Sequence, residues 1–85
     1  MTIDNTLETR SVSHGSFYDN SRLSQTMKSE VRDAAISADV HLTSLQLEAL
    51  DMIVHKIARI CCGDPTFADH WHDIAGYATL VEKTL

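Results

Sequence analysis

The chain has no excess of positive charge, no long apolar run and no basic N-terminus ahead of an apolar stretch. A net charge of -5 argues against a general nucleic-acid binder, which needs a basic face to displace counterions. No apolar run approaches the roughly 20 residues of a membrane span, and nothing has the form of a signal peptide. We therefore expect a cytoplasmic protein that touches neither nucleic acid nor a membrane.

Cysteine is equally scarce, since only Cys61 and Cys62 are present and they are adjacent. Neighbouring residues on a helix point about 100° apart, so a disulfide between these two is geometrically poor. We expect one buried thiol and one at a boundary, and nothing suggests an oxidising compartment. The chain also lacks a phosphate-cradling glycine loop and the spacing of a zinc finger.

Chain length limits the stability of a lone molecule. Eighty-five residues make one domain, and so short a chain buries only about 60–65% of the surface that its unfolded form exposes. We therefore expect a homo-oligomer or a complex with a partner. Residues 1–13 are rich in Thr, Ser, Asn and acids and predict a flexible arm. Residues 14–85 carry the helical patterns and predict a single helical domain.

The first helical pattern predicts a helix from about Ser21 to Ser37, capped by one of residues 19–21. Lys28 falls on its polar face, and such a face is most often simply solvated. The opposite face is apolar, because Leu23, Met27, Val31, Ala34 and Ala35 fall at helical spacing.

The second helix begins at Thr43, which has the form of a capping box with Gln46. Two apolar stripes run side by side along it, so we expect it to pack on more than one side as the central helix. Gly63 follows its last turn, at a position that commonly needs a positive φ. The stripes hold Leu47, Leu50, Val54, Ile57 and Cys61, and Leu45, Ala49, Ile53 and Ile60.

The third helix follows the corner, with Asp64 as its cap, or else Thr66 with Asp69 in the first turn. Gly76 lies inside it, where glycine costs about 1 kcal/mol against alanine. Close approach of another helix would explain this glycine, and room for a ligand is the alternative. The apolar face holds Phe67, Trp71, Ile74, Ala78, Val81 and Leu85. The fold class is therefore all-α, a compact three-helix domain with a C-terminal antiparallel helical hairpin.

Charged and imidazole groups recur at four-residue steps on the second and third helices, so they share faces. When the hairpin closes, residues equally distant from the corner meet. Arg59 then faces His70 or Asp69, His55 or Lys56 faces Asp73, and Asp51 or Met52 faces Tyr77. This polar seam can be a purely structural set of ion pairs, which contribute about 0–1 kcal/mol each when exposed.

A metal site is a second interpretation of the seam, because bundle proteins build such sites from Asp and His pairs on facing helices. A hard cation would take Asp51, Asp69 and Asp73. Zinc or a redox metal would recruit His55, His70 or His72.

A third interpretation is anion or nucleotide binding by His55, Lys56 and Arg59, with the aspartates orienting them. The segment from His14 to Ser21 leaves a related question open. Phe17 and Tyr18 either plug the start of the first helix, or His14, Ser16 and Tyr18 line the mouth of a pocket.

Three stretches, residues 14–20, 50–60 and 63–77, resemble an uncharacterised family of small phage and prophage proteins. The last is the most specific, with Gly63-Asp-Pro followed by Asp-x-Trp-x-Asp-Ile-Ala-Gly-Tyr. This family is similar in outline to the all-α MazG-like NTP pyrophosphatases, in which a carboxylate precedes an Asp. The resemblance implies that Asp73 matches that Asp and that Asp69 or His70 matches the preceding acid.

Those enzymes bind magnesium through Glu-x-x-Glu on the preceding helix, whereas this chain has Asp51 and His55 there and no Glu-x-x-Glu anywhere. We therefore expect a small phage-type binding protein without catalysis or a cofactor of its own, in the host cytoplasm if phage-encoded. It would inhibit a host defence protein or bind a nucleotide. The alternative is a MazG-like nucleoside triphosphate pyrophosphatase that uses Mg²⁺ or Mn²⁺. The expected binding residues are His14, Tyr18, His55, Lys56, Arg59, Asp69 and Asp73.

Overall fold

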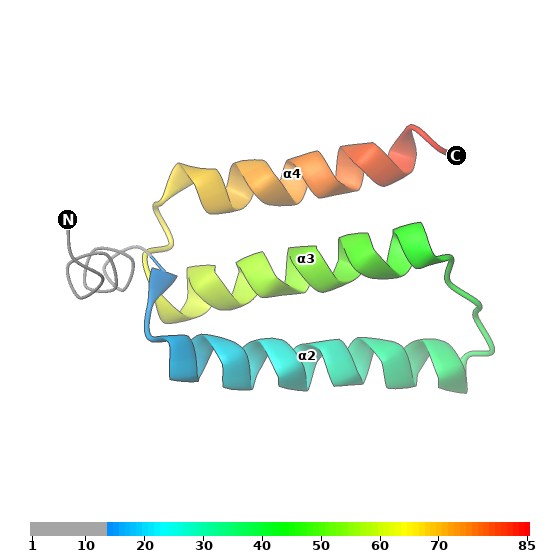
Figure 1. The fold of residues 1–85 in the computed structure, drawn as a ribbon, viewed down its shortest axis with the longest axis horizontal. Helices are drawn as coiled ribbons and strands as arrows, with labels where there is room; N and C mark the ends of the chain where they lie inside the picture. The colour runs from blue at the N-terminus through cyan, green and yellow to red at the C-terminus, as the bar shows by residue number, and fades with distance from the viewer. Residues whose placement is uncertain (1–13) are drawn as a thin grey trace.

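The computed structural model describes residues 14–85, and the arm expected over residues 1–13 lies outside the described residues. The chain forms helix α2 over Phe17–Ser37, helix α3 over Ser44–Cys62 and helix α4 over Ala68–Glu82. The described part contains no strand, so the all-α fold class with a C-terminal antiparallel hairpin is confirmed (Figure 1). None of its helices is long and apolar enough to cross a membrane.

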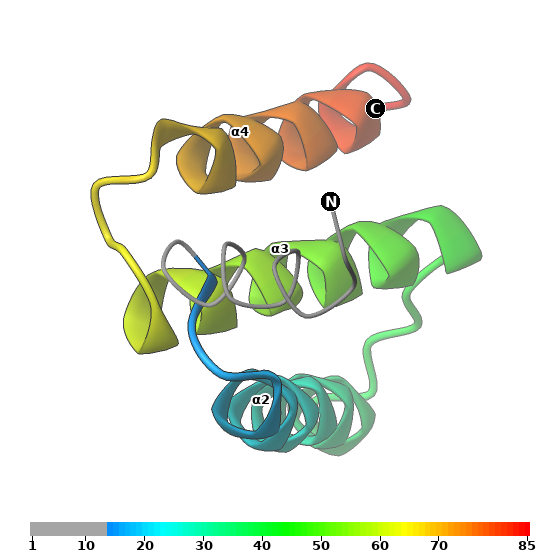
Figure 2. The same ribbon diagram turned by 60° about the vertical axis from the view of Figure 1, so that its left-hand side comes forward.

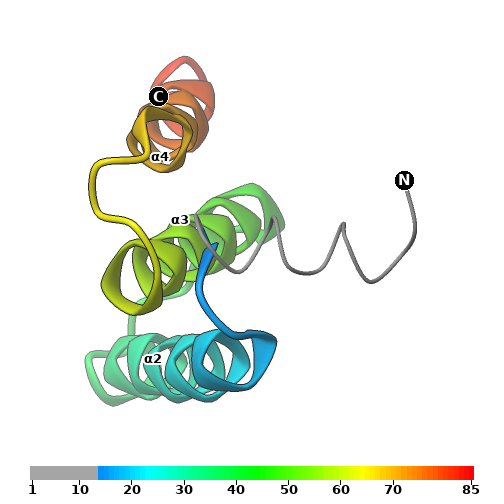
Figure 3. The ribbon, with the colours of Figure 1, turned by 90° about the vertical axis from the view of Figure 1, so that its left-hand side faces the viewer.

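Helix α3 is the central helix, as its two apolar stripes predicted. It packs against both α2 and α4, which do not pack against each other. Figures 1 and 3 show α2 and α4 on opposite sides of α3. The buried apolar side chains of the described residues all belong to α3: Ala49, Val54 and Ala58. The capping box is also confirmed, since the Thr43 hydroxyl accepts from the Gln46 amide at 3.1 Å and the Gln46 side chain accepts from the Thr43 amide at 3.0 Å.

Helix α2 begins at Phe17 rather than at Ser21, and the expected cap within residues 19–21 is wrong. The cap is Ser16, whose hydroxyl accepts from the Asp19 amide at 3.0 Å. Phe17 and Tyr18 are 84% and 73% exposed, so they do not plug the start of the helix. The side chains that α2 buries are instead polar, and they are Asn20 and Ser24.

The glycine that needs a left-handed backbone is Gly15, not Gly63. Gly63 has φ -129°, whereas Gly15 has φ +78°. A Cβ on Gly15 would lie 2.1 Å from the carbonyl oxygen of Cys62, so only glycine fits where the chain passes the end of α3. The blue segment that enters α2 runs beside that end in Figure 2. Cys61 and Cys62 are both free thiols. Cys61 is exposed and Cys62 is half-buried, so neither is the buried thiol that was expected.

The corner before α4 is held differently from either predicted cap. Asp64 Oδ1 accepts from the Thr66 amide at 2.9 Å and from the Thr66 hydroxyl at 2.6 Å. These bonds close a turn, and α4 itself has no side-chain cap, although Asp69 lies in its first turn as expected. Trp71 donates from Nε1 to the Pro65 carbonyl at 2.8 Å.

The inward face of α4 is rotated relative to the predicted one. His70 is 1% exposed and is the buried residue of this helix, whereas Trp71 is 55% exposed. A Cβ placed on Gly76 would meet nothing within 4 Å, so the expected close approach of another helix at Gly76 is absent from residues 14–85.

The two glycines predict opposite responses to alanine. Gly15→Ala should lower the free energy of unfolding by more than about 2 kcal/mol, because it adds a clash with backbone to a left-handed residue. Gly76→Ala should raise it by roughly 0.5–1 kcal/mol, because the helix gains propensity and the methyl group meets open space. Urea unfolding followed by circular dichroism measures both, and a tolerated Gly15→Ala would contradict the close contact with Cys62.

Candidate functional site

The charged groups of α3 are divided between its two neighbours. Lys56 Nζ lies 2.9 Å from Asp73 Oδ2 on α4, so Lys56 rather than His55 is the partner of Asp73. The hydrogen bond from Lys56 holds the pKa of Asp73 below its ordinary value. Asp51 Oδ2 instead lies 2.7 Å from Arg32 Nη2 on α2, so the expected position of Asp51 opposite Tyr77 is wrong.

This division also separates the carboxylates that the sequence suggested as metal ligands. Asp51 of α3 faces α2 and is paired with Arg32, whereas Asp73 lies on α4 and is paired with Lys56 of α3. Residues 14–85 contain no group of three or more His, Cys, Asp or Glu side chains that could hold a metal ion. Asp51 is directed toward α2 while Asp69 and Asp73 lie on α4, on the other side of α3, so the three carboxylates expected to hold a cation do not converge.

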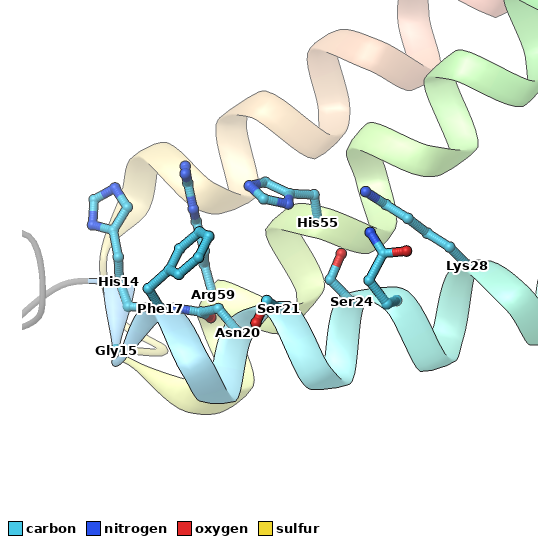
Figure 4. A pocket seen from close by; sticks show the side chains of 10 residues that line it. His14, Gly15, Phe17, Asn20, Ser21, Ser24, Lys28, His55 and Arg59 are labelled. Carbon is cyan, nitrogen blue, oxygen red and sulfur yellow. Dashed lines mark hydrogen bonds between the residues drawn. The ribbon is translucent and has the colours of Figure 1, made fainter.

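A pocket of about 560 Å³ lies between the N-terminal half of α2 and the C-terminal half of α3 (Figure 4). We call it the α2/α3 pocket. Three basic side chains reach it from two helices, namely Lys28 of α2 and His55 and Arg59 of α3. No carboxylate of residues 14–85 lines it, although the chain carries a net charge of -5. Its lining is His14, Gly15, Phe17, Asn20, Ser21, Ser24, Gln25, Lys28, His55 and Arg59.

The electrostatics of the α2/α3 pocket favour an anion. The pKa of His55 is lowered from 6.5, first by burial and then by the positive charges of Arg59, Lys28 and Lys56. The same charges that oppose another cation attract a negative group. Among the described residues, neither Lys28 nor Arg59 forms an ion pair. Two permanent positive charges therefore face the pocket, and no described carboxylate in its lining or in an ion pair compensates them.

Two buried polar atoms lie on residues that line the same pocket. Asn20 Nδ2 donates to the His14 carbonyl, which orients the amide, but Asn20 Oδ1 has no hydrogen-bond partner among the described residues. The same is true of Ser24 Oγ. Ser24 is only 2% exposed, and buried polar groups in native proteins nearly always have partners. Both side chains therefore retain hydrogen-bonding capacity beside the pocket.

A second pocket of about 420 Å³ lies between α3 and α4, and we call it the α3/α4 pocket. It shares His14 and Arg59 with the first and is also lined by Lys56, Phe67, Asp69, His70 and Asp73. Three rings close around one another at its end. The His14 and His70 centroids are 4.7 Å apart, and those of Phe67 and His70 are 4.8 Å apart. This ring cluster joins the segment before α2 to the start of α4.

The residues predicted to bind are therefore divided between two pockets. His14, His55 and Arg59 reach the α2/α3 pocket, whereas Lys56, Asp69 and Asp73 line the α3/α4 pocket. Tyr18 lines neither, because it points to solvent, and Ser16 serves as the cap of α2.

Residues of α2 are the part of the site that the sequence interpretation missed. Phe17, Asn20, Ser24 and Lys28 all line the α2/α3 pocket, and Lys28 had been placed on the solvated face. The sequence does carry a pattern for them, since positions 20, 24 and 28 hold polar side chains on successive turns of one helix face.

No protein-family model matches the chain, and no curated protein or solved structure matches it either.

The buried hydroxyl of Ser24 gives a test of the pocket's hydrogen bonding. Ser24→Ala should raise the free energy of unfolding by about 1 kcal/mol in the absence of ligand, because it removes a desolvated group without a partner. The control is Thr26→Ala, which removes an exposed hydroxyl bonded to the Arg22 carbonyl and should change stability by less than about 0.5 kcal/mol. A loss of stability in Ser24→Ala would show that this hydroxyl is already satisfied.

His55 predicts a pH dependence with a definite sign. Because its folded pKa lies below the ordinary 6.5, its contribution is complete above pH 6.5 and is lost as the pH falls through the folded pKa. His55→Gln should therefore show a shallower loss of stability on acidification than the unmodified protein. His41→Gln, which alters a side chain that is 91% exposed, is the control and should leave the slope unchanged. Equal slopes for all three proteins would contradict the positive environment of His55.

Proposed function

We propose that this protein is a small helical binding protein without catalysis of its own, and that it binds a nucleotide in the α2/α3 pocket. The observation that carries the proposal is the convergence of Lys28, His55 and Arg59 from two helices on one pocket, which no carboxylate of the described residues lines. Arginine recognises phosphate oxygens through a planar pair of donors, and lysine binds them as a point charge. These basic groups would hold the phosphates.

The size of the pocket supports the same class of ligand. Sites for small molecules and cofactors have volumes of about 300–1,000 Å³, and the α2/α3 pocket measures about 560 Å³. Lys28 replaces Lys56 in the set of binding residues expected from the sequence. Lys56 is paired with Asp73 and its side chain is 12% exposed, so its charge is compensated by the ion pair that joins α3 to α4.

Binding is proposed rather than hydrolysis because of where the carboxylates lie. A MazG-like pyrophosphatase needs acids placed to hold Mg²⁺ or Mn²⁺ beside the phosphates. The basic side chains of the α2/α3 pocket have no acid among their neighbours in its lining. The proposal is therefore a helical scaffold, similar to small phage proteins and in outline to MazG-like enzymes, that holds a nucleotide and leaves it intact.

Calorimetry with adenosine, AMP, ADP and ATP tests this function. The phosphorylated ligands should bind and adenosine should not, and affinity should fall as salt is raised because the contacts are ionic. Lys28→Gln and Arg59→Gln should each weaken binding about tenfold, the loss expected for one charge-assisted hydrogen bond. Arg22→Gln is the matched control, since it removes the same charge from the exposed side of α2.

Two results would contradict the proposal. One is the failure of every phosphorylated ligand to bind. The other is release of pyrophosphate from nucleoside triphosphates in the presence of Mg²⁺ or Mn²⁺, which would favour the enzyme. We propose separately that the protein forms a homo-oligomer or a complex with a host protein. The mass in solution, measured with the protein alone and with a host protein added, tests both, and a monomeric mass throughout would contradict both.

A further inference from the structure

We propose that the ring of Phe17 is the platform on which the base of the bound nucleotide stacks. This inference rests on the proposed function and extends it from the phosphates to the base. Phe17 is the first residue of α2, lines the α2/α3 pocket and is 84% exposed. A phenyl ring so open to water contributes little to folding, so its packing does not account for its position beside a basic pocket.

The backbone that carries Phe17 is held firmly on both sides. On the N-terminal side, Gly15 lies against the Cys62 carbonyl at the end of α3. On the C-terminal side, the Ser16 cap and the bond from the Asn20 amide to the Ser16 carbonyl, at 3.0 Å, complete the first turn of α2. The ring is therefore exposed without being on a loose segment. Stacking surfaces for bases have this character, because a pre-positioned ring loses little entropy when the base binds.

The groups around Phe17 are sorted into two kinds. Arg59 on α3 and Lys28 on α2 supply positive charge and His55 supplies an imidazole, whereas Phe17 supplies a flat apolar face. In Figure 4 the ring of Phe17 rises from α2 on the same side as the side chains of His55 and Lys28. A ligand that uses both kinds of group must carry an anion and an aromatic ring in one molecule. Inorganic phosphate, pyrophosphate and sugar phosphates carry the anion but no aromatic ring.

AMP and ribose 5-phosphate provide the test, because they differ by the base alone. The unmodified protein should bind AMP about tenfold more tightly than ribose 5-phosphate, the advantage expected from stacking one base on an aromatic ring. Phe17→Leu should bind the two ligands equally, because it keeps an apolar side chain and removes the ring. Phe17→Trp should restore the preference for AMP.

Tyr18→Leu is the matched control. Tyr18 is the next aromatic residue on α2, is 73% exposed and does not line the pocket, so its loss should leave the preference for AMP intact. Circular dichroism of each variant reports its fold, and the exposure of both rings predicts unchanged spectra.

The possible outcomes separate the two proposals. Equal binding of AMP and ribose 5-phosphate by the unmodified protein would overturn the role of Phe17 and leave the anion site standing. An unchanged preference in Phe17→Leu would do the same. If neither ligand binds at all, both the proposed function and the stacking platform are overturned.

Discussion

The contact between Gly15 and the last carbonyl of α3 determines where the neighbouring side chains of His14 and Phe17 lie. Because Gly15 has no side chain, the chain can pass within van der Waals distance of Cys62 before it turns into α2. This passage places His14 on one side of the contact and Phe17 on the other. His14 then borders both pockets, and Phe17 stands at the α2/α3 pocket. A larger residue at position 15 would displace both side chains together.

Charge segregation on α3 follows from its central position. A helix with one neighbour can direct all its charged groups to one interface, but α3 has neighbours on opposite sides. Asp51 is paired toward α2 and Lys56 toward α4, and both pairs join a helix to the centre of the molecule. Asp51 and Asp73 are thus engaged in ion pairs between helices. Arg59 is left without a carboxylate partner among the described residues, beside Lys28, and this is how an acidic chain comes to have a basic pocket.

Much of the fold could be predicted because local patterns determine it. The capping box at Thr43 and the two apolar stripes of α3 can be recognised without tertiary information. The short corner between α3 and α4 restricts how the two helices can align, and in the resulting alignment Lys56 meets Asp73. The rotation of α4 could not be predicted in this way. Helical spacing placed Trp71 on the apolar face, yet its indole donates to the Pro65 carbonyl at the corner, and His70 is buried instead. The site was harder to predict than the fold. Asn20, Ser24 and Lys28 form a polar stripe on α2 that resembles a solvated face until the position of α3 opposite it is known.

The ring cluster of His14, Phe67 and His70 has a consequence for how the molecule can open. Helices α2 and α4 each adhere to α3 along a separate interface, and the buried apolar side chains there are few and small. Local opening of either outer helix would therefore start at its own interface with α3. The ring cluster crosses between these two units, since His14 precedes α2 and the other two rings belong to the start of α4. It therefore opposes separation of the outer helices through contacts between the segments that lead into α2 and α4, although these two helices do not pack against each other.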